Sequence, residues 1–456
     1  MRLQTIVASE AGIVLDSNVK TGGGTDMTSQ LQALLDRAGE DCALHLILDG
    51  AALVQGLRLH SNTTLECPNT SCGLYLADHS DVPLLRNSRE DTACIRQENI
   101  AILGGTYNHN CRAQAHDVPC PEGTFNRVLE YRRWVVAMEF FGVRNLTVRD
   151  VTILNQRCFA FLLINWHRVT LENITIPLTE HMDAENQDGI NIWGPGSCLT
   201  LRNIRGRSGD DFIAITPDQL DGVSSVEDVL VDGVQLENAD QGIRLLSRGT
   251  GRLDRVTLCN ISGSYRSFGF YINPWFPDGE GGNFGNILIE NVDLRQTEPN
   301  YTYTEPMLFR LGGNIECITF RNIRHHNPAD GRKLFQIGIP CCEVEDPAAP
   351  RGAEVSQRIK TVIVDGLTVT GDRHDTAYFG IYDRVEHLIL RHTAILREGT
   401  PSGTLLHFGS AGRIGVLHLH DLYTERLKVF SDAPARIGQT VTENVLCSGA
   451  AAPEGN

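Results

Sequence analysis

One short pattern of apolar and polar positions recurs along most of the 456-residue chain. In each copy, apolar residues alternate with polar ones, a small or polar residue follows, and another apolar residue closes the motif. Clear copies are LTVRDV at 146–151, VTLENI at 169–174, LTLRNI at 199–204, VLVDGV at 229–234, VTLCNI at 256–261, ILIENV at 287–292 and ITFRNI at 318–323. Weaker copies follow at 362–367, 388–393 and 417–422. A period of about 23 to 31 residues, with one longer gap before residue 362, is typical of stacked repeats.

The alternation within each copy is the period of a strand with one buried face. It predicts that Val169, Leu171 and Ile174 point inward, as do Leu199, Leu201 and Ile204 of the next copy. A polar residue at the bend suits a turn with left-handed dihedrals; it is Asn173, Asn203, Asn260, Asn291 and Asn322. A period near 25 with three short strands describes one β-helix coil that pairs in parallel with the next at about 4.8 Å. The β-branched content and the lack of amphipathic stretches argue against helical repeats.

A helix is predicted near the start of the chain. The segment MTSQLQALLDRAGE follows a glycine-rich turn, its leucines fall at helical spacing, and Asp26 or Thr28 serves as the N-cap. Such a helix would cover the open end of a repeat stack. Loops off the stack, which commonly line a binding groove, are expected at about 108–135, 274–284 and 341–357.

The predicted fold is therefore all-β: a right-handed single-stranded parallel β-helix with a short N-terminal capping helix. We expect one domain over 1–456, with the cap at about 20–40, the coils at about 45–430 and a C-terminal tail at 431–456.

Composition narrows the possible partners. The net charge of −16 argues against nucleic acid as a partner, because phosphate binding needs a basic surface.

The chain has 13 cysteines, an odd number at irregular spacings, which favours free thiols over a disulfide framework. The alternative is a metal or redox site at Cys67 with Cys72, or at Cys341 with Cys342. Residues 1–20 lack a secretory apolar run, and no stretch has the length of a membrane helix. We expect a cytoplasmic protein without a membrane partner, and its oligomeric state stays open.

Two neighbouring coils carry a concentration of carboxylates. The first reads Asn186-Gln187-Asp188-Gly189, and the second, about one coil later, reads Gly209-Asp210-Asp211. Stacking should place Asp188 beside the Asp210–Asp211 pair on adjacent strands. The following coil should place another set of polar side chains in register with them, namely Asp240, Gln241 and Arg244.

Paired carboxylates at this spacing suit inverting glycoside hydrolysis. That reaction needs one carboxylic acid to protonate the leaving oxygen and a carboxylate base to activate water, roughly 6.5–9.5 Å apart. One rung of about 4.8 Å plus a residue along the strand reaches that range. A single Asp-Gly such as Asp232-Gly233 is an ordinary turn signal, whereas NQDG followed one coil later by GDD points to chemistry. Trp275 could stack on a sugar ring or merely pack its loop.

At these residues the sequence resembles glycoside hydrolase family 28, the polygalacturonase family. Asn186-Gln187-Asp188-Gly189 is similar to the family's Asn-Thr-Asp-Gly, and Gly209-Asp210-Asp211 is similar to its Gly-Asp-Asp. The opening GGGTDMTSQLQALLDRA also resembles the family's N-terminal cap. The resemblance implies that Asp210 is the general acid, that Asp188 and Asp211 hold the attacking water, and that no cofactor or metal is needed.

The resemblance breaks at the next coil. The family's Gly-His-Gly is replaced by Asp240-Gln241-Gly242, and Gly242-Ile243-Arg244-Leu245-Leu246 lacks the lysine of the family's Arg-Ile-Lys. Those basic residues bind the substrate carboxylate in the family, so uronate and neutral sugars both stay open as substrates here. We assign substrate binding to Asn186, Asp240, Gln241, Arg244 and Trp275.

Three functions follow from these features. The first is a glycosidase, of the inverting kind by resemblance, acting on pectin-related or other plant-type oligosaccharides or polysaccharides. The second is a polysaccharide lyase or a glycosyl-transferring β-helix enzyme such as an inulin fructotransferase. The third is a non-catalytic glycan-binding β-helix similar to a phage tailspike. Product analysis separates the first two, and a trimer without hydrolysis would favour the third.

Overall fold

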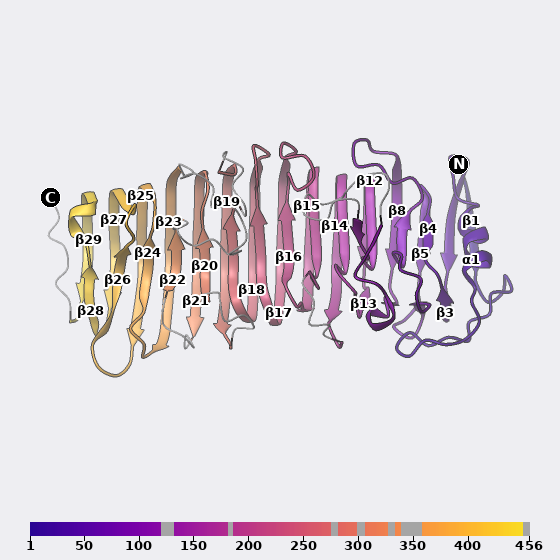
Figure 1. Cartoon of the computed structure of the whole chain (residues 1–456), viewed down its shortest axis with the longest axis horizontal. Coiled ribbons are helices and arrows are strands. Elements are labelled where there is room, and N and C mark those ends of the chain that lie inside the picture. The colour runs from indigo at the N-terminus through magenta and orange to yellow at the C-terminus, as the bar shows by residue number, and fades with distance from the viewer. Residues whose placement is uncertain are drawn as a thin grey trace. The chain divides into compact units, whose positions relative to one another are not determined.

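The computed structural model describes residues 1–119, 132–180, 186–274, 281–298, 306–326, 333–338 and 358–449. The chain divides into two compact units, Met1–Leu220 and Asp221–Asn456. In each unit parallel strands stack coil on coil, in the architecture of a right-handed parallel β-helix (Figure 1). The predicted fold class is confirmed, whereas a single domain over the whole chain stays a prediction.

Three parallel ladders build the first unit, so each coil contributes three strands as the sequence predicts. One ladder contains β1 (Arg2–Val7), β2 (Cys42–Ile47), β5 (Thr63–Glu66), β8 (Gln97–Leu103), β12 (Met138–Arg149), β14 (Phe161–Pro177) and β15 (Ile190–Arg207). The second contains β3 (Ala51–Val54), β6 (Gly73–Leu76), β9 (Thr106–Asn108) and β13 (Thr152–Leu154), and continues into the later parts of β14 and β15. The third joins β4 (Leu57–Leu59), β7 (Leu85–Asn87), the first parts of β12, β14 and β15, and β16 (Asp211–Thr216).

The predicted helix is α1 (Thr28–Leu35), which buries Leu31, Leu34 and Leu35 and contacts β2 and β4. Its N-cap is Met27, not Asp26 or Thr28. The Asp26 carboxylate accepts a hydrogen bond from the Thr28 backbone one residue too early to cap the helix. That the helix covers the open end of the stack stays a prediction.

The second unit is also built from parallel ladders. One ladder contains β17 (Val226–Leu246), β18 (Leu253–Asn273), β19 (Phe284–Gln296), β21 (Ile315–His326), β23 (Ile359–Asp372), β25 (Arg384–Arg397), β27 (Arg413–Thr424) and β29 (Ile437–Cys447). Another joins the ends of β17 and β18 to β20 (Met307–Leu311), β22 (Lys333–Ile337), β24 (Ala377–Ile381), β26 (Ser402–Phe408) and β28 (Leu427–Ser431).

The C-terminal boundary of the coils lies later than predicted. The strand β29 pairs with β27 along its length, so coils extend to Cys447 and the predicted tail from 431 contains a full strand. No residue of β29 is buried, and Thr440 and Thr442 stand level with the buried Leu417 and Leu419 of β27. An exposed terminal rung therefore lacks the apolar alternation by which the inner rungs are recognised.

The loops expected off the stack have different outcomes. Within 108–135 the structure describes a short antiparallel pair, β10 (Asp117–Pro119) and β11 (Arg132–Trp134), that stands apart from the parallel ladders. The segments 275–280 and 339–357 lie outside the described residues.

The bend residues of the repeat form ladders of their own. The predicted inward residues Val169, Leu171 and Ile174 are all 1% exposed. At the bends the asparagines adopt left-handed dihedrals, with φ of 59° at Asn260 and 55° at Asn291. Their side chains bond to each other rather than only to the local backbone, since Asn291 donates to Asn260 at 3.1 Å. Both predictions about the repeat are thus confirmed.

This conformation predicts a difference between two substitutions of Asn291. In the left-handed conformation the Cβ atom of alanine lies too close to a backbone carbonyl oxygen, whereas glycine has no Cβ. We expect Asn291→Ala to lose more free energy of unfolding than Asn291→Gly. The difference is at most about 1 kcal/mol, because glycine's extra freedom in the unfolded chain destabilises the glycine variant and so offsets part of the strain in the alanine variant. Urea denaturation of the two variants measures the difference. Equal stabilities, or a less stable glycine variant, would contradict the proposed origin of the asparagine.

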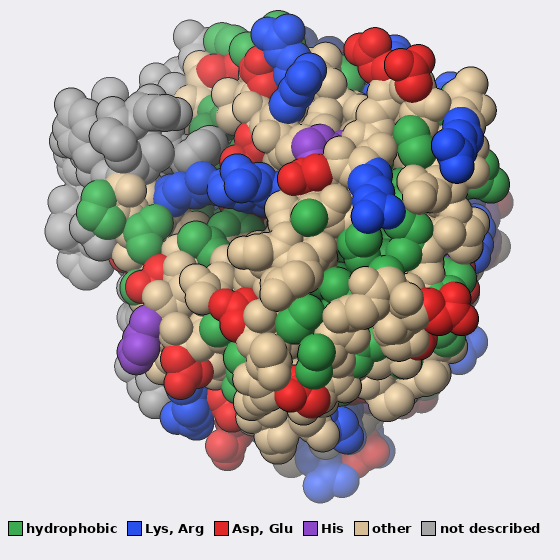
Figure 2. Space-filling view, turned by 90° about the vertical axis from the view of Figure 1, so that its right-hand side faces the viewer, with side chains coloured by type: hydrophobic (Ala, Val, Ile, Leu, Met, Phe, Trp, Pro, Cys, Tyr) green, Lys and Arg blue, Asp and Glu red, His purple; other side chains and the backbone are tan. Residues whose placement is uncertain are grey.

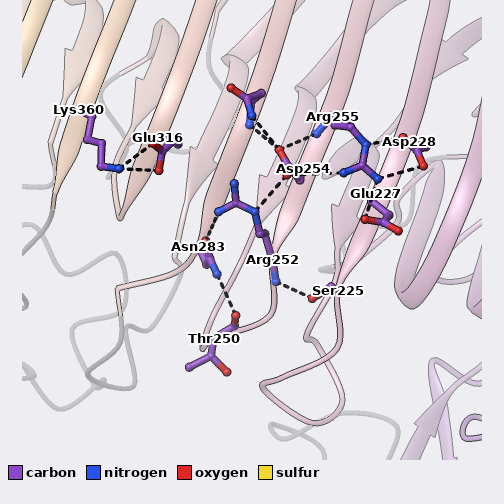
Figure 3. A network of polar contacts seen from close by, with 11 residues as sticks. Ser225, Glu227, Asp228, Thr250, Arg252, Asp254, Arg255, Asn283, Glu316 and Lys360 are labelled. Atoms are coloured by element: carbon purple, nitrogen blue, oxygen red, sulfur yellow. Dashed lines mark hydrogen bonds and ion pairs between the residues drawn. The ribbon is translucent and has the colours of Figure 1, made fainter.

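Ion pairs connect neighbouring coils at the start of the strands of the second unit (Figure 3). Arg255 contacts Asp228 at 2.6 Å and Glu227 at 2.7 Å, and Lys360 contacts Glu316 at 2.7 Å. These side chains are solvent-exposed, so each pair contributes little to stability and mainly orients the rungs.

Charged side chains of both signs lie on one side of the molecule (Figure 2). Figure 2 views the side that lies at the right of Figure 1, where acidic and basic side chains are interspersed among uncharged ones. Within the described residues no helix has the length and apolar content to span a membrane.

Candidate active site

Two adjacent rungs of the first unit bring the predicted aspartates together. Ile190 lies level with Ile213 across β15 and β16, and the same register places Asp188 level with Asp211. The backbone confirms this, because Gly189 N donates to the Asp211 carbonyl at 2.9 Å. Parallel neighbours lie about 4.8 Å apart, so the two aspartates occupy equivalent places on consecutive coils.

Close packing between two coils explains why glycine follows Asp188 at position 189. A Cβ atom at Gly189 would collide with the carbonyl oxygen of Phe212 on the next rung. Only glycine lets the two coils approach at the point where the carboxylates stand.

The three aspartates differ in exposure. Asp188 is 4% exposed and Asp211 is 6% exposed, whereas Asp210 is only half-buried. The Asp188 Oδ2 atom accepts a hydrogen bond of 2.6 Å from the Asn191 amide. Asp210 is therefore the most accessible of the three groups, and Asp188 is held in a fixed orientation.

The buried thiol of Cys158 is affected by the charges of two of these aspartates. Burial, and then the negative charge of Asp188, raises the pKa of Cys158 well above its ordinary value, and Asp210 adds to this effect. Both carboxyl groups thus lie within electrostatic reach of the same thiol.

Hydrogen bonds from the preceding coil support the NQDG turn. Gln156 donates to the Asp188 carbonyl at 3.0 Å, and Gln187 donates back to the Gln156 carbonyl at 2.9 Å. Asn186, predicted to bind substrate, lies in this turn with φ of 61° and is half-buried. The turn is thus fixed by its neighbours rather than by its own sequence alone.

An aromatic cluster lies beside the aspartates and was missed by the sequence reasoning. The ring centroids of Trp134 and Phe159 are 4.8 Å apart, and those of Trp134 and Trp193 are 6.3 Å apart. Trp193 also donates to Asn191, the residue that holds Asp188, at 3.4 Å. Asn191 and Trp193 are two residues apart on one strand directly after NQDG, so their side chains lie on the same face. This spacing was the signal that could have indicated both residues.

A second pair of acidic residues is Glu139 of β12 and Glu90, which follows β7. Glu139 is level with Arg86 and Leu162, is 1% exposed and forms an ion pair with Arg133. Arg86 contacts Glu90 at 3.3 Å. Burial, and then the charge of Glu139, raises the pKa of Glu90 to about 9.

This raised pKa predicts a pH-dependent stability. Between its ordinary value of 4.5 and about 9, Glu90 holds a proton in the folded chain and loses it in the unfolded chain. Stability should therefore fall as pH rises through this window, by up to about 1.4 kcal/mol per pH unit. Glu90→Gln should flatten that slope, as measured by urea denaturation at several pH values. Glu98→Gln, at an exposed ion pair with Arg144, is the matched control, and equal slopes in the wild type and Glu90→Gln would refute the shift.

The predicted substrate-binding residues of the second unit are largely buried. Asp240 is fully buried, and its Oδ1 atom accepts a hydrogen bond of 3.0 Å from Ser267. Gln241 lies level with Phe268, and Arg244 lies level with Tyr271. That these residues stand in register with the aspartates of the first unit stays a prediction.

Arg244 has a neighbour that the sequence reasoning missed. Its guanidinium carbon lies 4.6 Å from the Tyr271 ring centroid, and that of Arg310 lies 5.2 Å from the same centroid. One tyrosine thus contacts two guanidinium groups by cation–π attraction. Arg310 lies in the segment FRLGG, which resembles no known motif of the site. Only the stacking of coils brings it near Arg244. Trp275, the remaining predicted residue, lies outside the described residues.

Comparison with known proteins supports the predicted resemblance. Residues 126–224 match the family model of glycosyl hydrolases family 28. In this segment the chain is similar to that family. The matched segment contains Asp188, Asp210 and Asp211, so the resemblance rests on the coils that carry the candidate site.

Two curated relatives are polygalacturonases. The chain is 26% identical to that of Brassica napus over 262 residues, which cover 53% of this chain and 60% of the relative. It is 25% identical to that of Cochliobolus carbonum over 210 residues, which cover 39% of this chain and 57% of the relative. The match thus spans less than two thirds of either relative.

Solved structures share the fold. A mutant tailspike protein of E. coli bacteriophage HK620 in complex with a hexasaccharide superposes with a TM-score of 0.57 at 11% identity, covering 96% of this chain and 76% of the other. The Streptococcus pneumoniae surface protein and adhesin PfbA gives a TM-score of 0.52 at 14% identity, covering 92% of this chain and all of the other. These likenesses concern the fold alone.

Proposed function

We propose that the chain is an inverting glycoside hydrolase that cleaves pectin-type oligosaccharides or polysaccharides. The observation that carries the proposal is the placement of Asp188 level with Asp211 on adjacent rungs, with the more accessible Asp210 next to them. The similarity of residues 126–224 to glycosyl hydrolases family 28 and the two polygalacturonase relatives support the same reaction and substrate class.

The chemistry divides between the accessible and the buried groups. Asp210, as a carboxylic acid, donates its proton to the glycosidic oxygen while the bond to the anomeric carbon breaks. A water molecule held by Asp188 and Asp211 attacks that carbon from the opposite face and gives its proton to a carboxylate. The hydrogen bond from Asn191 fixes Asp188 for this task.

Product analysis tests the reaction. A panel of pectic and hemicellulosic oligosaccharides is incubated with the chain in ¹⁸O-labelled water, and the products are analysed by mass spectrometry. Hydrolysis predicts one ¹⁸O atom at each new reducing end of the pectic substrates. An unsaturated product without the label would establish a lyase, a product joined to a second sugar would establish a transferase, and no cleavage across the panel would favour a glycan-binding protein.

We also propose that the chain works in a reducing compartment such as the cytoplasm. Every cysteine in the described residues is a free thiol, including the exposed Cys94 and Cys198. Burial raises the pKa of Cys67 to about 12, which argues against the thiolate that a metal or redox role for Cys67 and Cys72 would need. Recovery of the native protein in a membrane-free cytosolic fraction is expected, and its recovery only from the medium would contradict the proposal.

A further inference from the structure

The last coils of the second unit break the asparagine ladder with histidine and aspartate. His392 and Asp421 adopt the left-handed conformation of the bend, with φ of 49° and 51°. They lie level with each other, because their neighbours Arg391 and His420 pair across β25 and β27. Imidazole and carboxylate groups thus occupy positions that asparagine holds in earlier coils.

Two imidazole rings converge on one carboxylate oxygen. His420 Nδ1 lies 2.9 Å and His392 Nε2 lies 3.5 Å from Asp421 Oδ2. The ligand atoms offered by these three residues all lie within 4.8 Å of one another. This is a set of two nitrogen atoms and one oxygen atom around a common point.

Each of the three side chains is oriented by another polar group. The second ring nitrogen of His392 lies 2.7 Å from Asp365 Oδ1, and that of His420 lies 3.1 Å from Glu443 Oε2. Asp421 Oδ1 accepts a hydrogen bond of 2.9 Å from the Asn444 amide. Metal-ligating histidines characteristically have such a carboxylate behind the ring, which fixes the tautomer.

The proton count favours a cation at the centre. A neutral imidazole carries one N–H, yet each of these rings has a carboxylate at both nitrogens. If each N–H faces its outer carboxylate, Asp365 or Glu443, two nitrogen lone pairs face the Asp421 oxygen. A metal ion between these lone pairs and that oxygen removes the repulsion.

We propose that His392, His420 and Asp421 bind a divalent first-row transition metal, with Zn²⁺ as the best match. Two imidazoles and one carboxylate suit Zn²⁺ with an open fourth position, whereas Ca²⁺ and Mg²⁺ prefer oxygen ligands alone. The His392 side chain is 57% exposed, so the ion can enter from solvent. The metal joins the rungs β25 and β27 and, through Glu443 and Asn444, orients β29.

Titration calorimetry with Zn²⁺ on the untagged full-length chain, stripped with a chelator, tests the site. We expect one Zn²⁺ per chain that is lost in His392→Asn and His420→Ala. His392→Asn is the safer variant, because asparagine is the residue that earlier coils hold at this bend. Asp365→Asn leaves all three ligands in place and should weaken binding by about 10- to 100-fold, as loss of an outer carboxylate does.

A matched control tests whether the loss of binding is specific to the three proposed ligands. His418 lies on the same strand with its ring 6.5 Å from that of His387, so His418→Ala should bind Zn²⁺ as the wild type does. The proposal is overturned if the wild type binds no Zn²⁺, or if His392→Asn binds it with unchanged stoichiometry and affinity. Binding is read from heat and metal content, so neither result depends on the proposed hydrolase activity.

Discussion

Replacing Asp210 by asparagine should lower kcat by on the order of 100- to 10,000-fold, the usual contribution of a general acid. Asparagine is nearly isosteric but has no proton to give to the leaving oxygen. The Asp210 backbone carbonyl, which accepts a hydrogen bond of 2.8 Å from Ser208, is unchanged by the substitution. Turnover of a pectic oligosaccharide and thermal unfolding of the same sample measure activity and stability together.

The matched control for this variant is Asp150→Asn. Asp150 lies at an exposed bend of the same unit with φ of 62°, where asparagine is the usual residue. This control should retain wild-type turnover. The assignment of Asp210 fails if Asp210→Asn keeps full turnover, or if its activity is lost only because the chain unfolds.

Replacing Phe309 by alanine should cost about 3–5 kcal/mol in free energy of unfolding. Phe309 is fully buried in a row of stacked rings, with centroids 4.9 Å from Phe270 and 4.6 Å from Phe335. The row continues to Phe379, 4.8 Å from Phe335. Phe309 also lies 4.4 Å from the Phe320 ring, so removing it leaves a cavity and breaks three aromatic contacts at once.

Urea denaturation of Phe309→Ala measures this cost. Phe309→Leu, which refills most of the volume but not the stacking, should lose clearly less. A loss below about 1 kcal/mol in Phe309→Ala would mean that the stack relaxes around the gap, contrary to the close packing of protein cores.

The repeat was predictable because its signal is local. Val169, Leu171 and Ile174 reveal a buried face within six residues, and the asparagine that follows each strand marks the bend. The rung β29 was not predictable in the same way, because Thr440 and Thr442 stand level with the buried Leu417 and Leu419 of β27 and break the apolar alternation. The N-cap at Met27 was missed since Asp26 and Thr28 bond to each other instead.

The candidate site was predictable only where stacking keeps a constant period. One coil separates Asp188 from Asp211, so their proximity follows from the repeat length. The Glu139–Arg133 pair and Glu90 could not be found this way, because β7, β11 and β12 reach one another through loops of unequal length. The same holds for Arg310, which lies two rungs beyond Arg244 on one ladder.

Proton NMR of the first product formed from a pectic oligosaccharide of known linkage tests the central claim most directly. If Asp210 protonates the leaving oxygen while Asp188 and Asp211 deliver water from the other face, the new reducing end must appear first with inverted anomeric configuration. Initial release of the retained anomer would instead require a covalent intermediate on one of these aspartates, and would contradict the account.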